Sequence, residues 1–271
     1  MTVAITLFPD MYVDSVVQLR CIRAMRELDG VAWASAGMAT PANVETLLAE
    51  GVAAGDVASA GANDFVLVVR ASSPQAADEA LSIVNAVPRR RLEFATGREC
   101  ARRAMAALGH ATASMPRAQD RVPIWPDDLV GSITHTDLWA AAAVARRDQG
   151  FMAIGIDLEP ADALPPELWA SVCTPEEQAK LMIIRGMTPD LAARLVYCMK
   201  EASFKCQYPI SCAMLEFADL AIDVDAEAGT FSATYQKVVP PFDVHDRLVG
   251  RFAISAGHIA SAVVVTSEHV R

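Results

Sequence analysis

Tyr197-Cys198-Met199-Lys200-Glu201-Ala202-Ser203-Phe204-Lys205 predicts the long helix on which the fold depends. The surrounding run, residues 190–206, contains no glycine, and Pro209 follows it, so we expect a helix of about four to five turns. Glu201 and Lys205 are four residues apart and therefore lie on one face. An ordinary surface ion pair would give the same spacing. The neighbouring side chains are mostly apolar, so this face is not wholly turned to water: Leu195, Val196, Met199, Ala202 and Phe204.

The segment Ile154-Gly155-Ile156-Asp157-Leu158-Glu159 alternates in character from one residue to the next. In a strand, this pattern points Asp157 and Glu159 to one face, where their charges repel unless a cation lies between them. Together with Glu201 they would offer three hard oxygen ligands, which suit Mg²⁺. An edge strand that runs out into solvent at Pro160 is the alternative, and the segment alone does not decide between the two.

Four blocks of sequence, in their order along the chain, resemble those of the 4′-phosphopantetheinyl transferases. Residues 155–159 followed by residues 200–205 resemble the paired signature of that family. The earlier blocks resemble those of the larger single-chain type, the Sfp-like and enterobactin-synthase-like enzymes: residues 90–98 with 100–102, and residues 121–126 with 131–136. The resemblance covers about residues 75–265. It implies an α/β (α+β) fold of two pseudo-symmetric halves.

The resemblance also implies an activity. The enzyme would transfer the 4′-phosphopantetheine group from coenzyme A to a serine of an apo acyl or peptidyl carrier protein, releasing 3′,5′-ADP, in polyketide or nonribosomal peptide biosynthesis. Asp157, Glu159 and Glu201 would hold Mg²⁺ or Mn²⁺. Glu201 would remove the proton of the serine hydroxyl. Lys205 would stabilise or protonate the leaving phosphate, and Lys200 would assist.

An arginine-rich segment indicates the kind of ligand that the protein binds. Residues 89–103 carry six arginines against two glutamates, in a chain of net charge −10. Such a patch suits a small polyanion, although a solvated helix face would look the same. A helix predicted over residues 94–108 would place Arg98 and Arg102 on one face. Taken by itself, His135 is better explained as a buried histidine or a residue at the end of a strand. The resemblance implies that coenzyme A contacts Arg91, Arg98, Arg102, Arg121, Thr134, His135 and Lys205.

The first 87 residues predict a separate small α/β unit, and residues 88–271 would form the transferase domain, with halves meeting near residue 148. Residues 1–70 resemble the N-terminal region of FdrA-like proteins, relatives of acyl-CoA synthetase subunits. We expect this unit to precede or merge with the first half and to give structural support. The expected elements are strands at 3–8, 31–36 and 64–70, helices at 14–28, from Pro41 to Gly51 and at 74–87, and a loop at 51–62.

Further elements are expected along the transferase domain. Thr174 and Pro175 have the residue types of a helix cap and first turn. Residues 115–128 are rich in proline and charge and predict a loop. The remaining expected strands cover residues 131–136, 138–145, 220–224, 230–235, 250–255 and 259–265.

The composition indicates which classes of protein this chain can belong to. A hydrophobic content of 53% predicts a folded globular chain. No apolar run approaches the roughly 18–20 residues that span a bilayer, and the first residues lack the pattern of a signal peptide. The six cysteines show no zinc-ligand or C-x-x-C spacing, which predicts reduced thiols in the cytoplasm. The acidic net charge disfavours a general nucleic-acid binder. We expect a monomer without nucleic-acid or membrane partners.

Two other functions stay open at this point. A non-catalytic module that binds coenzyme A or a carrier protein would explain the unusual N-terminal region. An accessory subunit of an acyl-CoA ligase would fit the FdrA-like segment alone. Only the transferase requires Mg²⁺ and releases 3′,5′-ADP, and the complete set of Asp157, Glu159, Glu201 and Lys205 favours the enzyme. The sequence does not identify the carrier protein.

Overall fold

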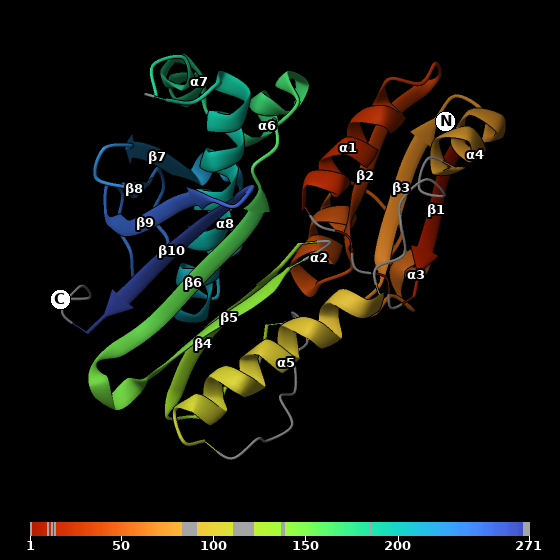
Figure 1. Cartoon of the computed structure of the whole chain (residues 1–271). Coiled ribbons are helices and arrows are strands. Elements are labelled where there is room, and N and C mark those ends of the chain that lie inside the picture. Colours follow the sequence, from red (N-terminus) through yellow and green to blue (C-terminus); the bar gives the residue numbers. More distant parts are fainter. Residues whose placement is uncertain are drawn as a thin grey trace. The chain divides into compact units, whose positions relative to one another are not determined.

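The computed structural model describes residues 2–9, 11, 13, 15–82, 91–110, 122–136, 139–184 and 186–267, with the backbone alone at 16, 20 and 91–95. Contacts divide the chain into two compact units. Unit 1 is Met1–Leu92 with Pro116–Ile124, and unit 2 is Glu93–Met115 with Trp125–Arg271. Helices and strands mix in both units, which confirms the predicted α/β (α+β) class (Figure 1).

Unit 1 is an antiparallel three-stranded sheet of order β1-β3-β2, covered by helices (Figure 1). Residues of β3 alternate between two apolar clusters, one shared with α1 and α4 and the other with α2 and α3. The central strand is therefore buried on both faces, as its continuous apolar sequence requires. The elements are β1 (Thr2–Phe8), α1 (Ser15–Arg26), β2 (Val31–Met38), α2 (Pro41–Ala49), α3 (Ala54–Val57), β3 (Phe65–Ala71) and α4 (Pro74–Ser82).

Most of the elements predicted for unit 1 are present. The predicted cap of α2 is confirmed, because Thr40 Oγ1 accepts a hydrogen bond from the Asn43 backbone N–H. The predicted loop at 51–62 is wrong in part, since the short helix α3 lies within it and buries Val57. The described part of α4 ends at Ser82, and the rest of the helix predicted to residue 87 lies outside the described residues.

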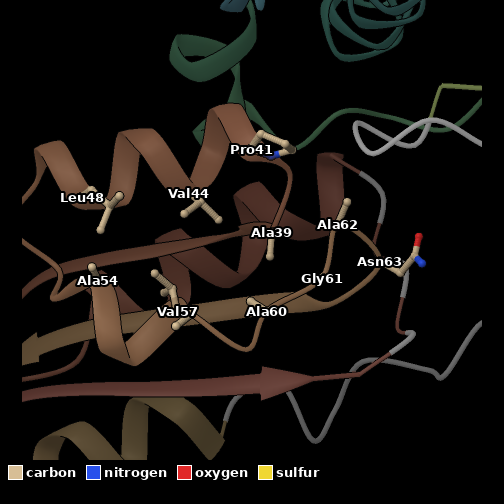
Figure 2. Close-up of a pocket in the computed structure, with 11 residues that line it drawn as sticks. Ala39, Pro41, Val44, Leu48, Ala54, Val57, Ala60, Gly61, Ala62 and Asn63 are labelled. Carbon is tan, nitrogen blue, oxygen red and sulfur yellow. The ribbon is translucent and has the colours of Figure 1, made fainter.

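An open hollow of about 610 Å³ lies beside α2 and α3 (Figure 2). Val44 and Leu48 of α2 point toward Val57 of α3 across it. Its lining is small or apolar apart from Asn63 and contains no titratable side chain. The residues that line this hollow therefore offer no charged side chain to bind a phosphate group.

Unit 2 combines a hairpin, β4-β5, with a five-stranded antiparallel sheet of order β6-β10-β9-β8-β7 (Figure 1). Helix α5 packs on the hairpin through Ala101 and Met105, and helix α8 packs on β6 and β10. The elements are α5 (Arg91–Ala107), β4 (Leu129–His135), β5 (Ala140–Arg146), β6 (Phe151–Pro160), α6 (Trp169–Val172), α7 (Pro175–Leu181), α8 (Pro189–Ser211), β7 (Leu220–Asp225), β8 (Thr230–Tyr235), β9 (Arg247–Ser255) and β10 (His258–Thr266).

Helix α7 begins at its predicted cap, whereas the cap of α8 at Thr188 was not predicted. Thr174 and Glu177 form a reciprocal capping box at the start of α7. Thr188 caps α8, which runs five residues past the predicted end and includes Pro209 in its last turns. A proline is tolerable this close to the end, where only one backbone bond is lost and the left-handed Cys212 then stops the helix.

Gly155 sets the close approach of β6 and α8. A Cβ atom at this position would overlap the Ala202 carbonyl oxygen and would lie 2.5 Å from the Cys206 backbone nitrogen. The helix backbone therefore rests directly on the strand at this point. This contact brings side chains of α8 within reach of the two acidic residues that follow Gly155.

We expect Gly155→Ala to lower the free energy of unfolding by about 3 kcal/mol, because the added methyl group meets immobile backbone atoms. Urea unfolding followed by circular dichroism measures this change. Gly55→Ala is the control, since its Cβ would meet nothing within 4 Å, and its effect should stay within about 1 kcal/mol. Equal stability of the wild type and Gly155→Ala would show that the close approach is not real.

Candidate active site

The site is built where the polar face of β6 meets α8. Gly155, Asp157 and Glu159 share this face, as the alternation predicts. The alternative of an edge strand that runs out into solvent is right about the edge and wrong about the solvent. β6 is the edge strand of its five-stranded sheet, but β4 side chains bond its free edge and Asp157 is only 5% exposed. A carboxylate buried this deeply needs compensating partners.

Asp157 finds two of these partners at one oxygen. Lys205 Nζ donates to Asp157 Oδ1 at 2.6 Å, and Thr134 Oγ1 donates to the same oxygen at 3.0 Å. Asp157 Oδ2 is buried and accepts no hydrogen bond from any residue within the described ranges. Lys205 remains 27% exposed, so its ammonium group joins a buried carboxylate to the surface. Three predicted site residues thus meet in one cluster.

Two hydroxyl groups attach β4 to β6. Ser132 Oγ accepts the backbone N–H of Ile156 at 3.1 Å, and Thr134 Oγ1 accepts that of Leu158 at 3.1 Å. The side chains therefore take the place of backbone carbonyls between the hairpin and the sheet. Ser132 was not predicted as a site residue, although its two-residue spacing from Thr134 is visible in the sequence. This arrangement sets Thr134 beside Asp157.

Glu159 forms a second, partly buried pair with α8. Arg194 Nη1 lies 3.1 Å from Glu159 Oε2. Arg194 was missed from the sequence, where the only signal is its position on the helical stripe 194, 198, 201 and 205. Both strand carboxylates are therefore matched by basic side chains of one helix.

Glu201 and Lys200 are neighbours in sequence with different surroundings. Glu201 is half-buried, one turn before Lys205 on α8. Lys200 is fully buried, and its Nζ donates to Glu177 Oε2 at 2.7 Å and to the carbonyl oxygens of Val172 and Phe217. Three bonds use all the donors of an ammonium group. These contacts do not favour the assisting catalytic role expected of Lys200.

The Cys198 thiol and the Ser261 hydroxyl are buried near Asp157. Ser261 lies opposite Asp157 in the β6–β10 register, and its Oγ is 3.1 Å from Cys198 Sγ. Burial, followed by the negative charge of Asp157, raises the pKa of the Cys198 thiol well above its ordinary value. Cys198 is therefore neutral at physiological pH. The burial of Cys198, Ser261 and Asp157 strengthens the attraction between Lys205 and Asp157.

The residues predicted to bind the nucleotide of coenzyme A show fewer contacts with this cluster. His135 ends β4, one residue after Thr134, and is half-buried. Arg98 and Arg102 lie on α5, whose Gly97 packs against β4. Arg102 bonds Glu99 at 2.7 Å, and the hydrogen bonds from Arg102 and Arg103 lower the pKa of Glu99. A phosphate would compete with Glu99 for Arg102. The Arg91 side chain and all of Arg121 lie outside the described residues.

The expected metal ligands are only partly arranged for a cation. In the part of the chain that the structure describes, no three His, Cys, Asp or Glu side chains lie close enough together to hold one metal ion. Asp157 Oδ2 is nevertheless a buried acceptor without a hydrogen bond from these residues. Its donor type fits Mg²⁺, which often binds one or two carboxylates and completes its shell with water and substrate phosphates.

Comparisons with known proteins identify the family. A sequence profile described as the 4′-phosphopantetheinyl transferase superfamily matches residues 153–256, and one described as the 4′-phosphopantetheinyl transferase N-terminal domain matches residues 77–145. The 4′-phosphopantetheinyl transferase Svp of Streptomyces mobaraensis is 37% identical over 195 residues, covering 70% of this chain and 78% of Svp. This chain belongs to the 4′-phosphopantetheinyl transferases.

Two further relatives of this transferase agree. The 4′-phosphopantetheinyl transferase Npt of Nocardia iowensis is 34% identical over 194 residues, covering 67% of this chain and 85% of Npt. PptT of Mycobacterium tuberculosis is 32% identical over 198 residues, covering 69% of this chain and 85% of PptT. The protein is therefore an enzyme that transfers phosphopantetheine from coenzyme A to carrier proteins. The family assignment favours this function over a non-catalytic module or a ligase subunit.

The N-terminal region of the transferase matches a different profile, described as AllF, heavy metal-associated domain, over residues 1–100. These residues include no histidine and two cysteines, Cys21 and Cys100. Cys21 is buried in the apolar core of unit 1. Such a donor set does not fit a thiolate or imidazole metal site. The match overlaps that of the transferase N-terminal domain at residues 77–100, so the boundary near residue 87 and the FdrA-like resemblance stay predictions.

Within the described ranges, no helix combines the length and apolar character that crossing a bilayer requires.

Proposed function

We propose that the cluster of Thr134, Asp157 and Lys205, together with Glu201, is the place where the phosphopantetheine group is transferred. The observation that carries this proposal is the 2.6 Å contact between Lys205 Nζ and the buried Asp157 carboxylate. It joins the two halves of the predicted signature, 48 residues apart in sequence, at a partly exposed cation. A cation in this setting suits a phosphate group.

Glu201 would act as the general base. It lies on the same face of α8 as Lys205, and its half-buried position leaves it within reach of solvent and substrate. It removes the proton from the carrier serine hydroxyl, directly or through a water molecule, and the alkoxide attacks the β-phosphorus of coenzyme A. Lys205 balances the charge of the leaving 3′,5′-ADP. Thr134 holds Asp157 in one orientation through its hydroxyl group.

Asp157, Glu159 and Glu201 would hold Mg²⁺ or Mn²⁺, which would neutralise phosphate charge in the bound substrate. His135 would donate a ring N–H to a phosphate oxygen, because it follows Thr134 at the end of β4. The arginines would hold the nucleotide phosphates as planar bidentate donors: Arg91, Arg98, Arg102 and Arg121. We assign Lys200 a structural role instead of a catalytic one.

The partner would be an apo acyl or peptidyl carrier protein. We also propose that the protein acts as a monomer in the cytoplasm. The six cysteines are free, and four of them are buried, which suits a reducing compartment.

Intact-protein mass spectrometry tests this proposal. An apo carrier protein incubated with the transferase, coenzyme A and Mg²⁺ should gain one phosphopantetheine group, and EDTA should abolish the gain. Asp157→Asn should reduce the rate of conversion strongly, whereas Asp223→Asn, which alters an exposed ion pair, should not. Full conversion by Asp157→Asn would remove Asp157 from the site. Conversion that persists in EDTA would overturn the metal assignment alone.

A further inference from the structure

Arg194 and Glu159 form an ion pair with little exposure between α8 and β6. Arg194 Nη1 lies 3.1 Å from Glu159 Oε2, and the two side chains are 8% and 15% exposed. Arg194 Nε is buried and makes no hydrogen bond to any residue in the described part of the chain. Burying such a pair adds little net stability, because the cost of desolvation offsets the attraction. An unsatisfied donor lowers the gain further, so stability alone does not explain this arginine.

The position of the pair relates it to the transfer site. Glu159 is two residues after Asp157 on the same face of β6, and Arg194 is seven residues before Glu201 on α8. Each strand carboxylate is thus bonded to a basic side chain of the same helix, Asp157 to Lys205 and Glu159 to Arg194. The matching charges allow two carboxylates to lie close together without repelling each other.

The two basic residues differ in what they can reach. Lys205 is 27% exposed and can meet a substrate phosphate. Arg194 is enclosed, so any influence on the substrate must pass through Glu159. Groups that hold a metal-binding carboxylate in this way commonly change metal affinity 10–100-fold when they are replaced.

We propose that Arg194 is a positioning residue that fixes the orientation of the Glu159 carboxylate and offsets its charge, so that Glu159 can serve as a metal ligand. This inference rests on the proposed function, in which Glu159 belongs to the metal-binding set. Arg194 itself contacts neither the substrate nor the cation.

Binding of Mn²⁺ in the presence of coenzyme A, measured by electron paramagnetic resonance without a carrier protein, tests the proposal independently of turnover. We expect Arg194→Lys and Arg194→Met to raise the Kd for Mn²⁺ about 10–100-fold. Arg146→Met is the control. Arg146 is more exposed than Arg194, at 32%, and bonds the Leu108 carbonyl and Asp128, so the Kd of this variant should stay within about twofold of the wild type.

A second set of variants separates positioning from loss of structure. Glu159→Gln removes the proposed ligand and should weaken Mn²⁺ binding by itself. Adding Arg194→Lys to Glu159→Gln should cause no further loss, because Arg194 acts only through Glu159. This comparison remains available if Arg194→Met does not fold, which circular dichroism reveals.

The outcomes are distinct. Wild-type binding of Mn²⁺ with no response to Arg194→Lys overturns the positioning role and leaves the proposed function intact. A loss caused by Arg194→Lys that persists in the Glu159→Gln background also overturns it. Absence of Mn²⁺ binding by the wild type with coenzyme A overturns the metal assignment and this inference together.

Discussion

Glu201→Gln should lower kcat for phosphopantetheine transfer about 10²–10⁴-fold, because an amide cannot accept the proton of the carrier serine. The side chain keeps its size and its half-buried position, so the free energy of unfolding should change by no more than about 1 kcal/mol. Rates of carrier modification under saturating coenzyme A measure the effect on kcat.

Glu176→Gln is the control for Glu201→Gln. Glu176 is exposed in the first turn of α7. Its replacement by glutamine is the same chemical change as in Glu201→Gln, made outside the cluster of Thr134, Asp157 and Lys205. It should retain near-normal turnover. If Glu201→Gln also turns over normally, Glu201 is not the general base, and the proton must be removed by another group.

Lys200→Met should lower the free energy of unfolding by about 3–5 kcal/mol, the range expected when one partner of a buried ion pair is removed. Glu177 is only 4% exposed, and the substitution would remove the cation that pairs with it. It would also leave the carbonyl oxygens of Val172 and Phe217 without this donor. Glu177 additionally accepts the backbone N–H groups of Thr174 and Ile222, so the start of α7 and strand β7 should loosen as well.

Urea unfolding measures this loss against Lys180→Met. Lys180 forms an exposed pair with Asp223, at 55% and 71% exposure, and its removal should cost no more than about 1 kcal/mol. A stable Lys200→Met variant with greatly reduced kcat would contradict the structural role and restore the catalytic role expected from the sequence.

The elements of the site could be predicted because their signals are local. Alternation over residues 154–159 indicates a strand with one acidic face, and the spacing of Glu201 and Lys205 indicates one helical face. The meeting of these two elements came only from the family resemblance. The structure adds its physical basis, which is the absence of a side chain at Gly155.

The partners of the predicted residues could not be read from spacing. Arg194 meets Glu159 across 35 residues, and Ser132 meets Ile156 across 24 residues. The assisting role expected of Lys200 came from the family resemblance alone. Successive side chains on a helix point about 100° apart, so Lys200 and Glu201 face different surroundings. The sequence near Lys200 does not show that its side chain meets Glu177, which lies 23 residues earlier.

The most direct test of the site is a crystal structure of the transferase with coenzyme A and Mn²⁺, with the metal located by its anomalous scattering. We expect a single peak at about 2.0–2.2 Å from an Asp157 carboxylate oxygen, with the pyrophosphate of coenzyme A beside Lys205. A peak bound to none of Asp157, Glu159 and Glu201, or a pyrophosphate remote from Lys205, would contradict the account.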